Sequence, residues 1–299
     1  MKQITIISGK GGTGKTTLVA SFAALAENIV IADCDVDAPD LHLLLHPEIV
    51  KREEFRGSKV AAMDKTKCIE CGRCKEACRF NAISGTKSGY AVNQARCEGC
   101  GVCVFVCEQE AITLAERVSG HAFISKTKYG TMAHAQLNIA EEASGKLVTV
   151  VRNNAQQVAE EEGSALILID GSPGIGCPVI ASLTGVDLAL VITEPTMSGL
   201  HDLARILNVT RHFGIATVVC INKCDINEEN SRKITEFCKE RRVTIVRNIP
   251  YDSVVTDAMV AGMPVVEFSD CAVSDAIKEI WASIKSTTPS DSSGSVKGF

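Results

Sequence analysis

A glycine-rich stretch near the N-terminus limits the possible folds of this chain more than any other feature. It matches the pattern G-x-x-x-x-G-K-[ST] from Gly9 to Thr16, after an apolar run and before a helical one. Glycines let backbone amides wrap around phosphates, and the helix N-terminus favours negative charge. We therefore predict a phosphate-binding loop, in which Lys15 reaches the β- and γ-phosphates and the Thr16 hydroxyl binds Mg²⁺. A chance glycine-rich turn is the weaker alternative. The residues assigned to the loop are Gly9, Lys10, Gly11, Gly12, Thr13, Gly14, Lys15, Thr16 and Thr17.

Alternating apolar and helical runs predict the fold class. Continuous β-branched runs read as buried parallel strands at Ile4–Ser8, Ile29–Asp33, Leu166–Asp170, Leu188–Thr193 and Thr217–Asn222. Helical runs such as Thr16–Ala26 and Glu228–Arg242 lie between them. This alternation predicts an α/β fold with a doubly wound, mostly parallel sheet.

Composition narrows the partners and the location. The chain has 299 residues and a net charge of −5, which gives no electrostatic case for nucleic-acid binding. No stretch reaches the roughly 18 continuous apolar residues of a spanning helix, and the N-terminus has no signal-peptide pattern. The tail after Ser286 is rich in Ser, Thr and Gly, which predicts disorder and no amphipathic anchor. We expect a cytoplasmic protein without a stable membrane anchor.

Eight of the 14 cysteines lie in an internal repeat. A shift of 29 residues superimposes the first copy, Cys68, Cys71, Cys74 and Cys78, on the second copy, Cys97, Cys100, Cys103 and Cys107. The α/β pattern stops before this repeat and resumes after it, so the repeat is predicted to be an insertion. The expected divisions are residues 1–60 and 115–286 for the α/β domain, 61–114 for the insert and 287–299 for the tail.

The spacing C-x₂-C-x₂-C-x₃-C is typical of iron–sulfur ligation. Three closely spaced thiolates bind one [4Fe–4S] cluster, and the fourth ligates the neighbouring cluster. Zinc is the weaker alternative, because zinc sites usually pair two C-x₂-C units across a longer gap. The insert resembles bacterial two-cluster ferredoxins, although Arg79 and Glu108 replace the proline that usually follows the fourth cysteine. The predicted sets are Cys68, Cys71, Cys74 and Cys107 for one cluster, and Cys97, Cys100, Cys103 and Cys78 for the other.

Lys10 makes the phosphate loop more specific. With this second lysine, the loop resembles the deviant Walker A motif of the MinD/ParA/Mrp/nitrogenase-iron-protein family. The resemblance implies an ATPase in which Lys10 contacts phosphate across a nucleotide-bound homodimer; a solvated surface lysine is the alternative. It also implies that Asp35 orients or activates the attacking water and that Asp33 supports Mg²⁺. Asp37 or Asp40 could substitute for Asp35.

The same resemblance assigns two later strand ends. Asp170 before Gly171-Ser172-Pro173-Gly174 is similar to a Walker B aspartate that holds Mg²⁺ through water. A turn-capping aspartate is the alternative. The sequence Asn222-Lys223-Cys224-Asp225 and the loop at Pro250 resemble base-contacting segments, which implicates Asn222, Lys223, Asp225 and Pro250. ATP is the favoured nucleotide, with GTP as the alternative.

Three functions compete at this point. The favoured one couples ATP-dependent dimerisation to electron transfer through the two clusters, toward an unidentified redox or metallocofactor partner protein. The second is an iron–sulfur or metallocofactor assembly ATPase similar to Mrp and Nbp35, and the third is a positioning ATPase similar to MinD and ParA. Cys177 and the other scattered cysteines are expected to be buried thiols. His134 is expected to be structural.

Overall fold

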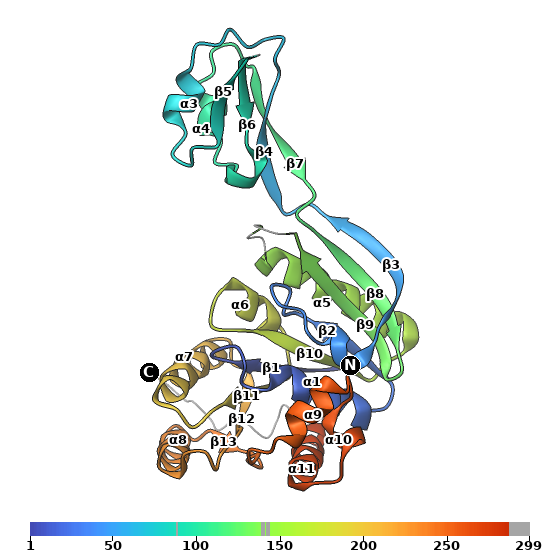
Figure 1. The fold of residues 1–299 in the computed structure, drawn as a ribbon. Coiled ribbons are helices and arrows are strands. Elements are labelled where there is room, and N and C mark those ends of the chain that lie inside the picture. Colours follow the sequence, from blue (N-terminus) through green and yellow to red (C-terminus); the bar gives the residue numbers. More distant parts are fainter. Residues whose placement is uncertain (88, 139–140, 142–143, 287–299) are drawn as a thin grey trace. The chain divides into compact units, whose positions relative to one another are not determined.

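The computed structural model describes residues 1–87, 89–138, 141 and 144–286, so the predicted tail lies outside the described residues. The chain forms two compact units (Figure 1). Unit 1 contains residues 1–52, 122–136 and the chain from 144 onward. Unit 2 contains residues 53–121 and 137–143. The expected divisions of the chain remain a prediction.

The largest sheet has nine strands in the order β13-β12-β11-β1-β10-β2-β9-β8-β3. From β13 to β9 every neighbouring pair is parallel. Strands β8 and β9 are joined by only two residues, which requires an antiparallel pair. The sheet is therefore mostly parallel, as the sequence predicts. Its strands are β1 (Lys2–Ser8), β2 (Ile29–Asp33), β3 (Glu48–Phe55), β8 (Gly120–Thr127), β9 (Gly130–Leu137), β10 (Leu166–Pro173), β11 (Leu188–Thr193), β12 (Ala216–Ile221) and β13 (Thr244–Ile245).

Helices cover this sheet through apolar contacts. Helices α1 and α11 pack together, and Phe22 stacks on Trp281 with ring centroids 5.3 Å apart. Helices α5 and α6 pack on each other and against β2 and β10. The helices of unit 1 are α1 (Lys15–Leu25), α2 (His42–Leu45), α5 (Ser144–Glu162), α6 (Cys177–Leu183), α7 (Met197–His212), α8 (Glu228–Glu240), α9 (Val254–Val260), α10 (Val265–Phe268) and α11 (Ala272–Ser286).

Unit 2 is built from two copies of a strand–helix–strand element. The first copy is β4 (Ser58–Met63), α3 (Arg73–Ala77) and β5 (Ile83–Thr86). The second is β6 (Gly89–Val92), the 3₁₀ turn η1 (Gln94–Arg96), α4 (Val102–Phe105) and β7 (Ile112–Arg117). The outer strands β4 and β7 pair antiparallel, as do β5 and β6.

The backbone repeats with the same 29-residue shift as the cysteines. Positive φ angles occur in equivalent pairs: Glu70 and Gly99 at 58° and 61°, Gly72 and Gly101 at 81° and 78°, and Asn81 and Glu110 at 50° and 48°. Left-handed backbone is uncommon outside glycine, so paired occurrences indicate a shared requirement of the fold. The sequence repeat is thus also a structural repeat.

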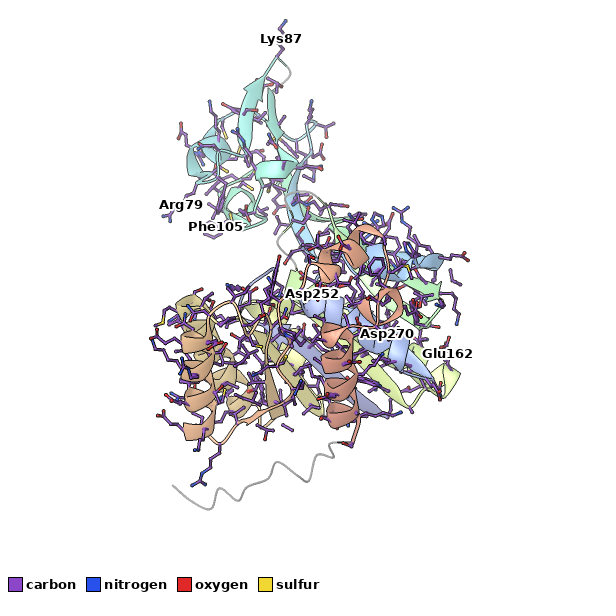
Figure 2. The ribbon with its side chains drawn as sticks, turned by 60° about the horizontal axis from the view of Figure 1, so that its bottom comes forward. Arg79, Lys87, Phe105, Glu162, Asp252 and Asp270 are labelled. Atoms are coloured by element: carbon purple, nitrogen blue, oxygen red, sulfur yellow. The ribbon has the colours of Figure 1, made fainter. Side chains whose placement is uncertain are left out.

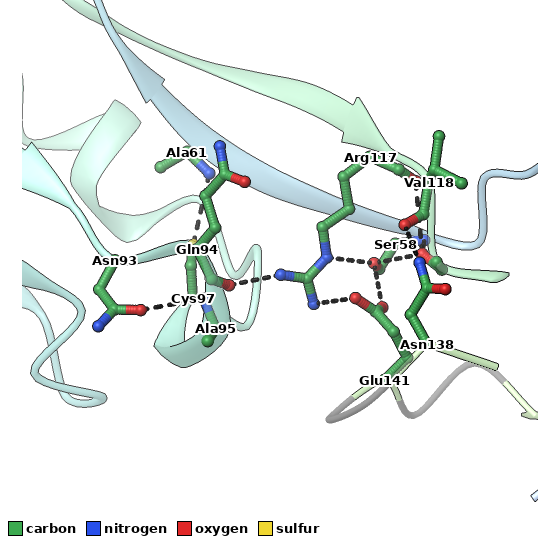
Figure 3. Close-up of polar contacts among 11 residues, drawn as sticks. Ser58, Ala61, Asn93, Gln94, Ala95, Cys97, Arg117, Val118, Asn138 and Glu141 are labelled. Atoms are coloured by element: carbon green, nitrogen blue, oxygen red, sulfur yellow. Dashed lines mark hydrogen bonds and ion pairs between the residues drawn. The ribbon is translucent and has the colours of Figure 1, made fainter.

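A polar network supports one end of unit 2 (Figure 3). The Arg117 guanidinium pairs with the Glu141 carboxylate at 2.6 Å and donates to the Ser58 hydroxyl at 3.3 Å and to the Gln94 carbonyl. The Glu141 side chain is only 6 % exposed. A carboxylate in that setting requires charge-assisted hydrogen bonds, which Arg117 provides.

Candidate functional site

The phosphate loop joins β1 to α1, as the sequence predicts. Gly12 and Gly14 have φ angles of 76° and 91°, where side-chain-bearing residues are strained. The Lys15 side chain is 5 % exposed, and its ammonium lies 3.8 Å from the Asp35 carboxylate. A buried lysine beside a carboxylate at a helix N-terminus is suited to bind an anion that displaces this pairing.

Two aspartates meet on neighbouring strands: Asp33 is the last residue of β2, and Asp170 lies three residues before the end of β10. Parallel pairing of β2 with β10 places Asp33 directly opposite Asp170. Both residues are 1 % exposed. Among the described residues, Asp33 Oδ2 and both carboxylate oxygens of Asp170 are buried without a hydrogen-bond partner of good geometry. The sequence predicts that each aspartate ends its strand. This is correct for Asp33, whereas β10 continues to Pro173, and the sheet register brings the two carboxylates together.

The electrostatics of this pair fit a cation. Burial raises the pKa of Asp170 to about 7, although the nearby Lys15 and the Thr16 hydroxyl act in the opposite direction. Burial, and then the charge of Asp170, also raise the pKa of Asp33 well above its usual range. Buried carboxylates with unsatisfied oxygens are ligands suited to a hard cation such as Mg²⁺. Asp33, Asp170 and the Thr16 hydroxyl are therefore the residues that would hold it.

Asp35 is better placed than its two alternatives. It is 8 % exposed and lies beside Lys15, whereas Asp37 and Asp40 are exposed. Its backbone N–H donates to Asp33 Oδ1 at 3.1 Å, which ties it to the paired carboxylates. The three-dimensional arrangement favours Asp35 for positioning water, which stays a prediction.

Backbone contacts connect the three loops around the site. The Ser172 hydroxyl donates to the Cys34 carbonyl at 2.5 Å. The Gly174 N–H donates to the Ser8 carbonyl at 2.8 Å. The end of β10 thus touches the segment after β2, and the residue after β10 touches the last residue of β1, where the phosphate loop begins. A change in one of these segments can therefore be transmitted to the others. Sequence reasoning did not find the role of Ser172.

Lys10 forms an ion pair within its own chain. Its ammonium lies 2.9 Å from one oxygen of Glu194, and the Lys223 ammonium lies 2.7 Å from the other. These two lysines lower the pKa of Glu194 despite its partial burial. Glu194 follows β11 directly, so its position at a strand end was a signal that the sequence analysis did not use.

The segment predicted to contact the base supports the phosphate loop in this structure. The Asn222 amide donates to the Thr13 carbonyl at 2.8 Å, and a Cβ at Gly14 would lie 2.5 Å from this amide. Asp225 Oδ1 accepts from the Tyr251 N–H at 2.7 Å, next to Pro250. Base contacts by Asn222, Lys223, Asp225 and Pro250 remain a prediction.

Gly9 is required for close packing. A Cβ at this position would clash with the Cβ of Asp202 on α7. The sequence analysis assigned Gly9 to phosphate wrapping alone and did not single out Asp202.

In unit 2 the eight cysteines line two cavities. One cavity is lined by Cys68, Cys71, Cys74 and Cys107. The other is lined by Cys78, Cys97, Cys100 and Cys103. Each cavity takes three cysteines from one copy of the repeat and one from the other. These are the two sets that the spacing predicts.

Backbone amides are directed at several of these sulfurs. The N–H groups of Ala61, Ala82 and Ala111 donate to the sulfurs of Cys97, Cys78 and Cys107, each at 3.4 Å. Such bonds stabilise thiolates. Burial raises the pKa of Cys74 and Cys103, so their thiolates would require a cationic group nearby.

The part of the chain that the structure describes contains no group of three or more His, Cys, Asp or Glu side chains gathered around one ion. This result bears on a single metal ion such as structural zinc. A cubane cluster is much larger than an ion, and its four ligands surround the whole cluster. Each of the two cavities is lined by four cysteines, and their role as cluster ligands stays a prediction.

Cys177 corrects one expectation. It is exposed, because it begins α6 immediately after the Gly174–Gly176 turn. Cys34, Cys220 and Cys238 are buried, while Cys224 and Cys271 are partly buried.

His134 shares a hydrogen bond of 2.8 Å with the Ser125 hydroxyl and stacks on Phe123, and burial lowers its pKa to about 4. That environment suits a neutral, structural imidazole.

The loop, the paired aspartates and the sheet define a P-loop nucleoside triphosphate-binding protein. The profile of the CobQ/CobB/MinD/ParA nucleotide binding domain matches residues 4–265, and the chain belongs to this family. Within the residues described above, no helix is long and apolar enough to cross a bilayer.

Known proteins resemble the whole chain and one part of it. An uncharacterised protein of Methanocaldococcus jannaschii is 34 % identical over 95 % of this chain and 96 % of its own length. One component of the ion-translocating oxidoreductase complex of Methanosarcina acetivorans is 33 % identical over 78 residues, 26 % of this chain and 27 % of its own length.

Two solved structures share the fold at low identity. One is the septum site-determining protein MinD of Pyrococcus horikoshii complexed with Mg-ADP, with a TM-score of 0.57, 17 % identity and coverage of 95 % and 96 % of the two chains. The other is the MinD cell division protein of Aquifex aeolicus, with a TM-score of 0.55, 18 % identity and coverage of 96 % and 98 %.

Proposed function

We propose that this protein binds and hydrolyses ATP and couples nucleotide-dependent dimerisation to electron transfer through two [4Fe–4S] clusters. One observation carries the iron–sulfur part: each cysteine cavity combines three cysteines of one repeat copy with one of the other. This interleaving is the ligand pattern of two-cluster ferredoxins. Membership of the family and the buried aspartate pair support the ATPase part.

The residues around the phosphate loop divide the chemical work. Lys15 exchanges its contact with Asp35 for the phosphates, and Asp35 is then free to orient a water molecule. Asp33, Asp170 and Thr16 would hold Mg²⁺, which would neutralise phosphate charge. Lys10 must leave Glu194 before it can reach a phosphate bound to a second protomer. Reaction and dimerisation are therefore linked through the same loop.

Metal analysis tests the iron–sulfur part. Anaerobically purified protein is expected to contain about eight iron and eight acid-labile sulfide per chain. The reduced protein should give cubane EPR signals that change between ADP and a non-hydrolysable ATP analogue, because the cysteine-containing insert lies along the chain between the Asp35 and Gly174 segments, which are expected to respond to the γ-phosphate. Stoichiometric zinc without sulfide would refute the clusters. Signals and potentials that ignore nucleotide would refute the coupling.

A positioning ATPase is the second candidate, supported by the similarity of fold to MinD. It predicts nucleotide-dependent localisation in cells that persists after all eight cluster cysteines are replaced by serine. An assembly ATPase is the third, since Cys177 gives unit 1 a solvent-exposed thiol that could bind iron or sulfide in transit. It predicts transfer of iron and sulfide to an apo acceptor, with loss of transfer in Cys177→Ser.

A further inference from the structure

The two halves of unit 2 share the strand–helix–strand order and the paired left-handed residues but carry different surfaces. The cavity of Cys97, Cys100, Cys103 and Cys78, here called the Cys97 cavity, is lined by the exposed side chains of Phe80, Val102 and Leu114. Phe105, three residues after Val102 on α4, is 91 % exposed. Solvent-exposed aromatic and aliphatic side chains that cluster in this way mark interaction sites.

The repeat provides an internal control for this surface. At the positions 29 residues away, the other half carries Arg73 in place of Val102, Glu76 in place of Phe105, and Gln109 in place of Phe80; Gly85 corresponds to Leu114. At one pair of equivalent positions the apolar residue is on the first half instead: exposed Ile69 corresponds to Glu98 of the second half. Because both halves fold alike, the backbone does not require the four apolar residues. Their presence on one half needs another reason.

The charges differ between the halves as well. On the first half, Arg73 and Glu108 form an ion pair beside the cavity of Cys68, Cys71, Cys74 and Cys107. The equivalent of Glu108 is Arg79, and the equivalent of Arg73 is Val102, so the second half has no counterpart of this ion pair and Arg79 is exposed. Across the described part of the chain, Arg79 forms no ion pair. Figure 2 shows Arg79 and Phe105 both projecting outward from unit 2, away from Lys87.

We propose that Phe80, Val102, Phe105, Leu114 and Arg79 form the docking face for a one-electron redox protein with an acidic surface. The inference rests on the proposed function, because it makes the cluster of the Cys97 cavity the one that exchanges electrons with the partner. An apolar centre with an arginine at its edge is the usual composition of an interface hot spot. The wall of the Cys97 cavity carries both the exposed carboxylate of Glu98 and, at its edge, the unpaired guanidinium of Arg79. The partner must therefore present a carboxylate opposite Arg79 and no negative charge opposite Glu98. Electron tunnelling weakens steeply with distance, so a partner seated on the wall of the Cys97 cavity approaches the nearer cluster.

The test uses oxidised flavodoxin, an acidic flavin protein, as the probe. The chain is reduced anaerobically, freed of excess reductant and mixed with flavodoxin. Each reduced cluster loses one electron, and the flavin gains one electron together with a proton from water. Stopped-flow absorbance measures this rate, and calorimetry measures binding between the two oxidised proteins. Oxidised methyl viologen, a small acceptor that needs no docking face, controls for the intrinsic reactivity of the clusters.

The informative variant is Val102→Arg with Phe105→Glu, which copies the residues of the other half. Flavodoxin binding and reduction rate are expected to fall about tenfold or more, with viologen rate and iron content unchanged. Arg79→Glu should weaken binding and reduce its dependence on salt. Glu76→Gln, at the position equivalent to Phe105, is the matched control and should change neither measurement.

Three results would overturn the docking face. The first is a wild-type protein that reduces viologen but neither binds nor reduces flavodoxin. The second is an equal effect of the double variant and Glu76→Gln. The third is a double variant that alters association between two copies of this chain while flavodoxin binding is unaffected. Absence of cubane EPR signals would instead refute the proposed function. Calorimetry would then still show whether flavodoxin binds at the proposed face, because binding is measured without electron transfer.

Discussion

Replacing Asp170 by Asn should change how the stability of unit 1 depends on pH. The folded-state pKa of Asp170 is about 7 against an ordinary value of 3.8, because its carboxylate is buried. A carboxyl group whose pKa is raised by folding contributes stability at low pH, and this stability is lost as pH rises from about 4 to 7. The full difference corresponds to about 4 kcal/mol, of which about 1 kcal/mol is lost between pH 6 and pH 8.

Asp170→Asn removes this titration and the repulsion that raises the pKa of Asp33. The metal-free variant should therefore lose about 1 kcal/mol less stability than wild type between pH 6 and pH 8. Trp281 is the single tryptophan and lies in the core of unit 1, so its fluorescence during urea unfolding reports this unit. EDTA keeps the site free of metal during the measurement.

Mg²⁺ with ADP provides the second half of the experiment. A ligand at 100 times its Kd should stabilise the wild-type protein by about 2.7 kcal/mol. At one fixed concentration of Mg²⁺ and ADP, the stabilisation should be larger at pH 8 than at pH 6, because protons compete with the ion for the carboxylates and raise its Kd at the lower pH. Asp170→Asn should lose most of this gain. Glu240→Gln, on a side chain that is 75 % exposed, is the control and should behave as wild type. Identical pH profiles for wild type and Asp170→Asn, or full Mg²⁺ stabilisation of the variant, would show that the carboxylate is not the group described above.

Three further predictions concern other parts of the molecule. Lys15→Ala should abolish ATP binding in calorimetry, whereas Asp35→Ala should retain binding and lose turnover; wild-type hydrolysis by Asp35→Ala would refute its assignment. Glu194→Gln removes the carboxylate that holds Lys10, so ATP-dependent association measured by light scattering should strengthen severalfold, and unchanged association would refute a restraining role. Gly99→Ala introduces a side chain at a φ of 61° where its Cβ would clash with a β4 carbonyl. Unit 2 should lose about 1–3 kcal/mol and bound iron, and normal iron content with unchanged melting would contradict this.

Local sequence determined the secondary structure of the site closely. The strands Ile29–Asp33 and Leu188–Thr193 have the predicted bounds, because they are continuous β-branched runs buried on both faces. Helix α8 ends at Glu240, two residues before the predicted end. Strands β3, β8 and β9 were not predicted. Their sequences mix polar and apolar residues, and such a pattern fits an exposed strand of unit 2 as well as an edge strand of the main sheet.

The phosphate loop and the positions of Asp33, Asp170 and Asn222 at or near strand ends could be derived from the sequence, because each depends on spacing along a short segment. The two cysteine sets follow from the internal repeat, and their role as cluster ligands stays a prediction. Tertiary structure alone decided which of these groups meet. Register between β2 and β10 places Asp33 opposite Asp170, and the end of β11 brings Glu194 to Lys10 and Lys223. The exposure of Cys177 and Phe105 was likewise unreadable from the chain. Contacts between distant segments depend on strand order and packing, and no local pattern of residues specifies these.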